Sequence, residues 1–198
     1  PLGRFQSCGR EGGRMKLNFQ EIVKPTAVLF AICVVISAAL AGTNLLTRDR
    51  IAQQELLKAE ESRKIVLPAA EEFESQEDGA YYTGTAGGQL VGYVFETESS
   101  GYGGTVSVMT GISGEGAITG VVILSHEETP GLGANAEKAE FLDQYLQSAP
   151  EGGLSVIKYQ TPGKGQIEAI TGATITSTAV TNAVNQAIEQ YYQVKGGA

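Results

Sequence analysis

The chain has 198 residues, which leaves room for a membrane anchor and one domain of ordinary size. Its single histidine, His126, excludes a multi-histidine metal site within the chain. Its two cysteines, Cys8 and Cys33, are too far apart in sequence to form a CxxC metal site or a disulfide framework. From Arg48 onward there are 9 basic and 20 acidic residues, so this part is not expected to bind nucleic acid.

The first predicted element is a membrane-spanning helix over residues 25–47, a stretch without any charged residue. About 20 such residues cross a bilayer as a helix. A signal peptide is the alternative, since residues 38–42 resemble a cleavage site. The apolar region of a signal peptide is typically only about 7 to 15 residues long. The length of this stretch therefore favours a retained anchor in membrane lipid.

Basic residues before this stretch set its predicted orientation. Arg14, Lys16 and Lys24 precede it. The positive-inside rule then places residues 1–24 in the cytoplasm and the C-terminal part of the chain outside the cytoplasmic (inner) membrane. Residues 1–14 lack any pattern and read as a tag remnant or upstream readthrough, so they carry no part of the fold prediction.

A helical stalk is predicted over residues 48–70. Apolar residues with interleaved charges indicate a helix over residues 48–64 that continues out of the membrane, and Pro68 ends it. The acidic stretch 71–80 reads as a loop. It opens a domain that is predicted to extend over residues 71–198.

Strand patterns follow, separated by turns that contain glycine. Val, Ile, Tyr and Phe alternate with small or polar residues, which is typical of an antiparallel sheet. The order of strands, helix, strands and helix indicates an α+β domain with an antiparallel sheet and packed helices. The predicted strands cover residues 89–99, 103–113, 117–128, 154–159 and 165–170, and the predicted helices cover residues 136–147 and 177–194.

The stretch "GLGANA" at residues 131–136 formally fits the GxGxxA fingerprint of dinucleotide-binding proteins. That fingerprint needs its first glycine at the end of a strand, so that the next helix meets the pyrophosphate. Here "HEETP" intervenes and Pro130 interrupts the entry, while the surrounding strands read as hairpins. A Rossmann site is therefore disfavoured.

Five of the eight residues in "TGATITST", residues 171–178, carry hydroxyl groups just before a predicted helix. Thr171, Thr174 or Ser177 could cap that helix. Alternatively, a hydroxyl displayed on the surface here carries a phosphoester. The free N–H groups and the dipole of a helix N-terminus favour an anion, and the Gly-Ala turn leaves room for a bulky group. Composition alone leaves both interpretations open.

Three stretches together resemble a known family. "TGATIT" resembles the [S/T]GATx[S/T] motif of proteins that carry FMN on a threonine. "SHEETPGLG" at residues 125–133 resembles their HxETPGLG loop, and "GYGG" at residues 101–104 resembles a third family segment. They occur in the family's order behind an N-terminal membrane helix. The chain thus resembles the G subunits of Rnf electron transport complexes and the related C subunits of Na⁺-translocating NADH:quinone reductases, and its compact length favours the former.

The resemblance implies a flavoprotein subunit that relays electrons within an ion-translocating ferredoxin:NAD⁺ oxidoreductase and completes no turnover alone. It implies FMN bound covalently through its phosphate, a flavin transferase that attaches it, and neighbouring subunits as partners. Thr176 is the implied attachment residue. The implied cofactor-binding residues are Thr171, Gly172, Ala173, Thr174 and Thr176 in the hydroxyl-rich motif, Glu128, Thr129, Pro130, Gly131, Leu132 and Gly133 in the loop, and Tyr102.

Some of these residues also have a purely structural interpretation. Tyr102 is either a sheet residue or a contact to the edge of the flavin ring, and His126 either bonds within its loop or moves a proton. Glu127 and Glu128 are adjacent, so on a strand they face opposite sides and form no acid–base pair. For the whole chain, the alternative is a non-catalytic membrane-anchored module whose hydroxyl-rich turn is only a helix cap.

Overall fold

The computed structural model describes residues 19–76 and 79–196, so Cys8 and most of the predicted segment 1–24 lie outside the described residues. The chain first forms one long helix, α1 (Phe19–Val66). This helix runs through both the predicted anchor and the predicted stalk helix, and it ends shortly before Pro68. Its stretch Val23–Arg48 has a mean hydropathy of 2.3 and is long enough to cross a membrane.

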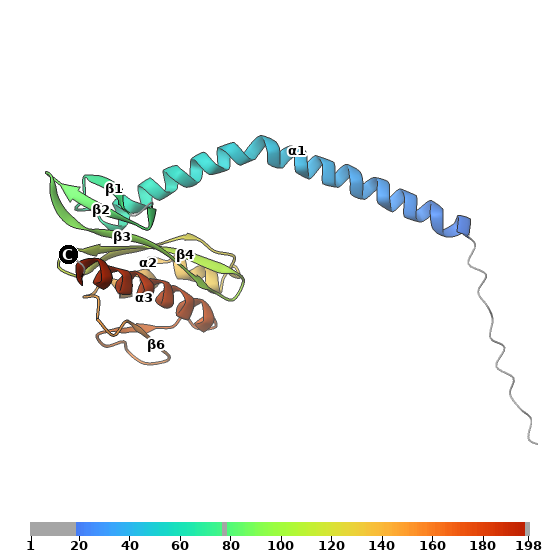
Figure 1. Ribbon diagram of the computed structural model, residues 1–198. Coiled ribbons are helices and arrows are strands. Elements are labelled where there is room, and N and C mark those ends of the chain that lie inside the picture. The colour runs from blue at the N-terminus through green and yellow to red at the C-terminus, as the bar shows by residue number, and fades with distance from the viewer. Residues whose placement is uncertain (1–18, 77–78, 197–198) are drawn as a thin grey trace, which may run out of the picture. The chain divides into compact units, whose positions relative to one another are not determined.

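Five strands then form one antiparallel sheet in the order β1-β2-β3-β4-β5, so each strand pairs with the next one along the chain (Figure 1). The predicted antiparallel sheet and the α+β class are confirmed. The strands are β1 (Glu72–Gln76), β2 (Tyr81–Ala86), β3 (Gln89–Ser100), β4 (Thr105–Ser113) and β5 (Ile118–Ser125).

The prediction of a loop over residues 71–80 was wrong for its first half. Glu72–Gln76 pairs in register with β2, from Glu72 opposite Thr85 to Gln76 opposite Tyr81. The acidic side chains of β1 are compatible with a strand because it lies at the edge of the sheet, where charged residues remain in solvent.

The main core lies between the sheet and the last helix, α3 (Thr174–Gly196), which lies along β3 and β4 in Figure 1. Phe95, Val108 and Ile112 from the sheet and Val184 and Ile188 from α3 are almost fully buried in this core. Thr97 on β3 adds a buried hydrogen bond between the sheet and α3, because its hydroxyl donates to the Ala183 carbonyl at 2.9 Å.

A second, smaller core covers the opposite face of the sheet. Val66 and Leu67, at the end of α1 and just after it, pack there with Val94 and Met109. The cross-strand pair Gly111 and Gly120 makes this possible, because a Cβ atom at either glycine would collide with the backbone of Val66. The end of α1 therefore lies directly against the sheet, and the compact unit that contains the sheet begins at Gln53.

The predicted single helix over residues 136–147 was wrong. The chain instead forms a 3₁₀ helix η2 (Gly133–Glu137), a short helix α2 (Ala139–Leu142) and a second 3₁₀ helix η3 (Asp143–Tyr145). Lys138 has an extended backbone, with φ −73° and ψ 141°, which interrupts the helix. The breaks allow Ala136, Phe141 and Tyr145 to enter the same core, although they do not fall on one helical face.

Two further predictions needed smaller corrections. The two short strands exist as a parallel pair, β6 (Ser155–Ile157) and β7 (Gln166–Glu168), and each is shorter than predicted. The last helix begins at Thr174, three residues before the predicted start at Ser177. The Ser177 hydroxyl accepts the Ile170 N–H and donates to the Ala173 carbonyl, both at 3.0 Å, so Ser177 lies inside the first turn.

Candidate functional site: a cleft at the start of α3

Three hydroxyls of the "TGATITST" stretch differ in their partners. Ser177 and Thr178 donate to carbonyls of their own helix region, at Ala173 and Thr174. Thr176 instead donates from Oγ1 to Oε2 of Glu128, at 2.6 Å and 48 residues away in sequence. Helix-local bonding therefore accounts for two of the hydroxyls, while Thr176 joins the helix to the loop after β5.

Thr176 is also where the sequence-based expectation of a surface hydroxyl was wrong. Its residue is 2 % exposed, because the first turn of α3 directs this position inward, toward Glu128 and Gly133. A Cβ atom added at Gly133 would lie 2.7 Å from Thr176 Oγ1. The hydroxyl is consequently held in one place at the floor of a cleft.

Glu128 is held as tightly as its partner. It is 5 % exposed, and its Oε1 accepts the backbone N–H groups of Tyr102 at 2.7 Å and Gly103 at 3.2 Å. These two amides belong to the "GYGG" stretch, which thus forms a small anion-binding turn between β3 and β4. Glycine at positions 101 and 133 leaves space for the carboxylate, since a Cβ atom at either would collide with it.

The charge state of Glu128 follows from these contacts. Burial by itself raises the pKa of the carboxyl group, but the hydrogen bonds from Thr176, Gly103 and Tyr102 favour the ionised form. Together they lower the pKa of Glu128 below its ordinary value of 4.5. The group is therefore a carboxylate at neutral pH.

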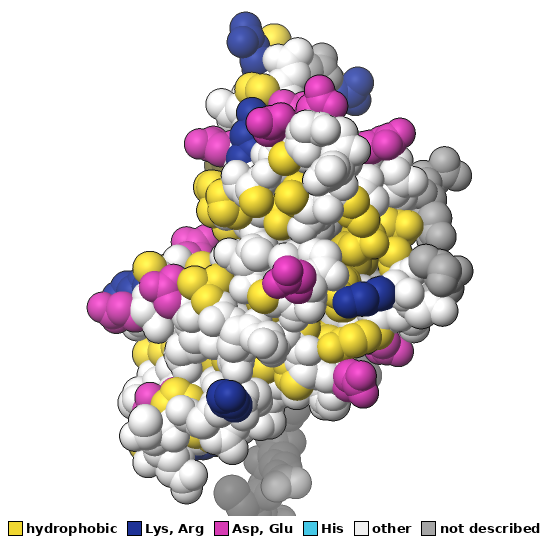
Figure 2. Space-filling view, turned by 90° about the vertical axis from the view of Figure 1, so that its left-hand side faces the viewer, with side chains coloured by type: hydrophobic (Ala, Val, Ile, Leu, Met, Phe, Trp, Pro, Cys, Tyr) yellow, Lys and Arg dark blue, Asp and Glu magenta, His cyan; other side chains and the backbone are white. Residues whose placement is uncertain are grey.

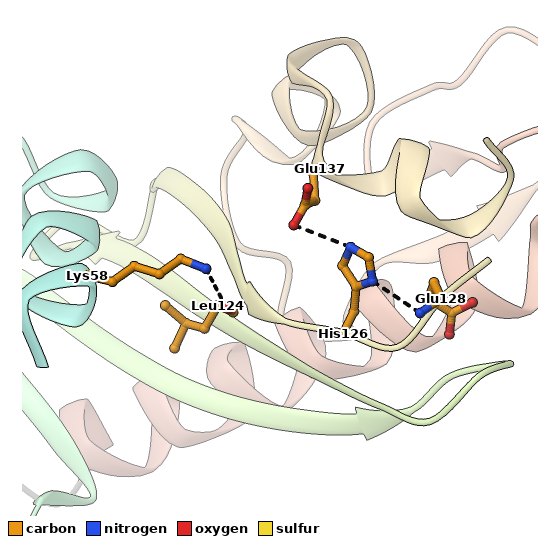
Figure 3. A network of polar contacts seen from close by, with 5 residues as sticks. All are labelled: Lys58, Leu124, His126, Glu128 and Glu137. Atoms are coloured by element: carbon orange, nitrogen blue, oxygen red, sulfur yellow. Dashed lines mark hydrogen bonds and ion pairs between the residues drawn. The ribbon is translucent and has the colours of Figure 1, made fainter. Parts of the chain in front are cut away.

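His126 fixes the backbone beside Glu128. Its Nδ1 accepts the Glu128 N–H at 3.1 Å, and its Nε2 lies 3.3 Å from Glu137 Oε1 on η2 (Figure 3). This geometry favours the loop-bonding interpretation of His126, which does not line the cleft.

The cleft above Thr176 has a volume of about 640 Å³. Large apolar side chains at its rim are exposed: Tyr102 (71 %), Leu132 (47 %), Tyr159 (85 %) and Ile175 (55 %). The cleft thus combines a polar floor with an apolar rim. Its lining consists of Tyr102, Glu128, Thr129, Leu132, Gly133, Tyr159, Gly172, Ala173, Thr174, Ile175 and Thr176.

Most of the residues predicted for the site therefore meet at one cleft, although they come from three separate segments. Pro130, Gly131 and Thr171 are not part of its lining. Gly131 has a φ of 78°, a left-handed conformation that glycine adopts without strain, and thus shapes the loop from outside the cleft. Thr171 lines a different cavity, beside Phe141 and Ile170.

Two lining residues were missed from the sequence. Ile175 lies within "TGATITST", where its place between two hydroxyl residues that face the cleft was a usable signal. No sequence signal marked Tyr159, which lies two residues after the short strand β6. Its φ of 55° places a bulky residue in the left-handed region, a strained conformation that tends to occur at functional sites.

Comparison with known proteins identifies the family. Residues 101–189 match the FMN-binding domain family, and residues 15–63 match the RnfG N-terminal region. The chain is 37 % identical, over 90 % of its length and 95 % of the relative's, to the G subunit of the Na⁺-translocating ferredoxin:NAD⁺ oxidoreductase complex of Acetobacterium woodii. The chain belongs to the G-subunit family of ion-translocating oxidoreductase complexes.

Other relatives of this G-subunit chain carry similar names. The G subunit of the proton-translocating ferredoxin:NAD⁺ oxidoreductase complex of Clostridium ljungdahlii is 33 % identical over 87 % of the chain and 92 % of the relative. Among solved structures, NqrC of Shewanella oneidensis aligns with a TM-score of 0.53 at 16 % identity, covering 66 % of this chain and 73 % of that one. The last similarity concerns the fold.

Proposed function

We propose that this chain is the membrane-anchored, FMN-carrying subunit of an ion-translocating ferredoxin:NAD⁺ oxidoreductase complex, within which it relays electrons. Relatives that match it along nearly their whole length are named as G subunits of such complexes. The observation that carries the proposal is the cleft, where the hydroxyl of Thr176 lies at the floor of a site with an apolar rim. The other subunits of the complex are its partners.

The residues of the cleft fit FMN. Its volume lies within the range of about 300–1,000 Å³ that small-molecule sites occupy. The apolar rim suits a flat aromatic ring, and the start of α3 suits a phosphate, because unpaired N–H groups and the helix dipole favour an anion. Bound FMN supplies the one- and two-electron redox chemistry. The chain itself holds the phosphate end, orients the ring and shields part of it from water.

Attachment through a phosphoester at Thr176 is part of this proposal. Thr176 stands apart from its neighbours, because Ser177 and Thr178 donate to nearby carbonyls. A flavin transferase is required as well, since a hydroxyl and a carboxylate alone cannot activate a phosphate for ester formation. Thr174, which also lines the cleft, is the competing attachment residue.

The anchor and its orientation complete the proposal. Within α1 the stretch Val23–Arg48 passes through membrane lipid, and the flavin-carrying unit faces the outside of the cytoplasmic membrane. The net negative charge of the C-terminal part argues against a role in nucleic-acid binding. In agreement, the face seen in Figure 2 carries scattered acidic side chains and isolated basic ones.

The experiment that tests the proposal compares the wild-type chain with three variants in a host that has the transferase. The wild type is expected to be yellow, to fluoresce on a denaturing gel, and to exceed the sequence mass by FMN less one water on the peptide with Thr176. Thr176→Ser keeps a hydroxyl and should keep the flavin. Thr176→Ala should lose it, while Thr174→Ala should keep it.

Because Thr176 is buried, Thr176→Ala is expected to lose stability as well as the flavin. Removal of the hydroxyl leaves Glu128 without one of its donors, which costs about 1–3 kcal/mol. Circular dichroism therefore has to show that Thr176→Ala is folded. Covalent flavin on Thr176→Ala and its loss from Thr174→Ala would contradict the residue assignment. A colourless wild type would support the non-catalytic module.

A further inference from the structure

The bond between Thr176 and Glu128 points to a role for the carboxylate in the attachment reaction. We propose that Glu128 is the proton acceptor when the Thr176 hydroxyl becomes esterified. The chain that receives the flavin thus supplies part of the chemistry for its own modification. This inference rests on the proposed attachment at Thr176.

The geometry suits this role. Oε1 of Glu128 accepts the amides of Tyr102 and Gly103, which leaves Oε2 to accept the hydrogen bond of the Thr176 hydroxyl, with 2.6 Å between the two oxygens. Both residues are nearly fully buried. Because burial and the two backbone amides hold the Glu128 carboxylate in place, the hydrogen bond is preorganised before any flavin donor arrives.

The donor must be an activated flavin. Esterification by free FMN would release water, which is unfavourable in aqueous solution. A flavin dinucleotide such as FAD avoids this, because its FMN phosphate is joined by an anhydride bond to a nucleoside monophosphate. Thr176 Oγ1 then forms a bond to the FMN phosphorus. The anhydride P–O bond breaks, and its electron pair leaves with the nucleoside monophosphate. The Oγ1 proton passes to Glu128 Oε2 and later to solvent, and nothing is oxidised or reduced.

An ionised Glu128 is a weak base, and this sets the order of events. A carboxylate cannot remove the proton of a free threonine hydroxyl to a significant extent. Once the bond to phosphorus is forming, that proton becomes strongly acidic and a weak base suffices. The aspartate of protein kinases accepts a substrate hydroxyl proton in the same kind of transfer. Glu128 therefore acts late, as the oxygen–phosphorus bond develops.

The test measures FMN incorporation by intact mass, with the full-length chain in detergent, a purified flavin transferase and FAD. Glu128→Gln keeps the length of the side chain and an oxygen for the two amides, but it cannot take the proton. With this variant as acceptor, the kcat of the transferase should fall by about 10²–10⁴-fold, the usual contribution of a general base. The KM for the chain should be unchanged. The matched control is Glu127→Gln, at an exposed neighbour, which should behave as the wild type.

A kcat of Glu128→Gln within threefold of the wild type, or a loss carried by KM alone, would overturn the proposal. If circular dichroism shows that Glu128→Gln is unfolded, Glu128→Asp and Glu128→Asn are compared instead. The Asp and Asn side chains match each other in length, and only Asp has a carboxylate. Equal kcat values for this pair would also overturn it. A wild type that gains no FMN at Thr176 refutes the attachment proposal itself, which is a separate result.

Discussion

Gly133 is the position where one added methyl group would reach both partners of the central hydrogen bond. A Cβ atom there would lie 2.5 Å from Glu128 Oε2 and 2.7 Å from Thr176 Oγ1. Gly133→Ala should therefore separate the two side chains and reduce FMN incorporation at least tenfold, measured by intact mass. Gly152→Ala is the control, since a Cβ atom at Gly152 meets nothing within 4 Å. Normal incorporation in Gly133→Ala would show that the bond is dispensable.

Glu128 also predicts a pH dependence of stability. Its pKa in the folded chain lies below the ordinary value of 4.5. A carboxyl group with a lowered pKa contributes stability above its unfolded pKa and loses that contribution as the pH falls through the folded pKa. In flavin-free protein, Glu128→Gln should thus lower the free energy of unfolding at pH 7 relative to the wild type. This difference should shrink below pH 4.5.

Denaturant unfolding at several pH values measures this difference, with Glu127→Gln as the exposed control. A deficit of Glu128→Gln that stays constant between neutral and acid pH would contradict the assignment, because a pH-independent loss would come from packing and not from the carboxylate charge.

The loop of residues 128–133 gives a prediction at the scale of one element. Leu132 and Thr129 line the cleft, so we expect them to contact the isoalloxazine ring, Leu132 by excluding water and Thr129 by a hydrogen bond. Leu132→Ala and Thr129→Val should keep the flavin on Thr176 but change its midpoint potential and absorption fine structure. A shift of about 30 mV in a two-electron couple corresponds to about 1.4 kcal/mol, comparable to one net hydrogen bond.

Spectroelectrochemical titration of the flavin-loaded chain measures both properties. Pro130 lies in the same loop but outside the cleft lining, so Pro130→Ala is the control for changes in loop conformation. If Leu132→Ala and Thr129→Val both keep the wild-type potential and spectrum, the loop does not touch the ring, and docking to a neighbouring subunit is its remaining role.

The elements that sequence patterns predicted are those rich in residues that favour their secondary structure. Strands β3, β4 and β5 are rich in Val, Ile and other apolar residues, and α3 carries apolar residues at helical spacing. By contrast, β1 reads "EFESQ" and is a strand only because β2 offers a partner. The segment after Gly133 looked like one helix, since an extended residue such as Lys138 leaves no mark in the sequence.

The candidate site, like the fold, was predictable only in part. Family motifs pointed to the three segments, but no local pattern indicates that Glu128 would meet Thr176, because contacts between residues so far apart depend on the whole fold. Likewise, the inward direction of Thr176 depends on where α3 begins, and that boundary was predicted three residues too late.

For the whole molecule, the prediction is that the flavin-carrying unit faces the outside of the cytoplasmic membrane. Gln89, exposed at the start of β3, can be replaced by cysteine in a chain with Cys8→Ser and Cys33→Ser. An impermeant maleimide should label Gln89→Cys in intact cells whose outer envelope admits it. The control is the chain with Cys33→Ser alone, where Cys8 should react only after lysis. The reverse pattern would place the unit in the cytoplasm.

The packing of the end of α1 against the sheet has a practical consequence for anyone who wants a water-soluble fragment. A fragment cut at residue 71, after the helix, would uncover Val94 and Met109 on one side of the sheet and invite aggregation. It would also lose Lys58, whose ammonium group donates to the Leu124 carbonyl at 2.6 Å (Figure 3). A fragment that starts at Gln53 keeps both and omits the apolar stretch.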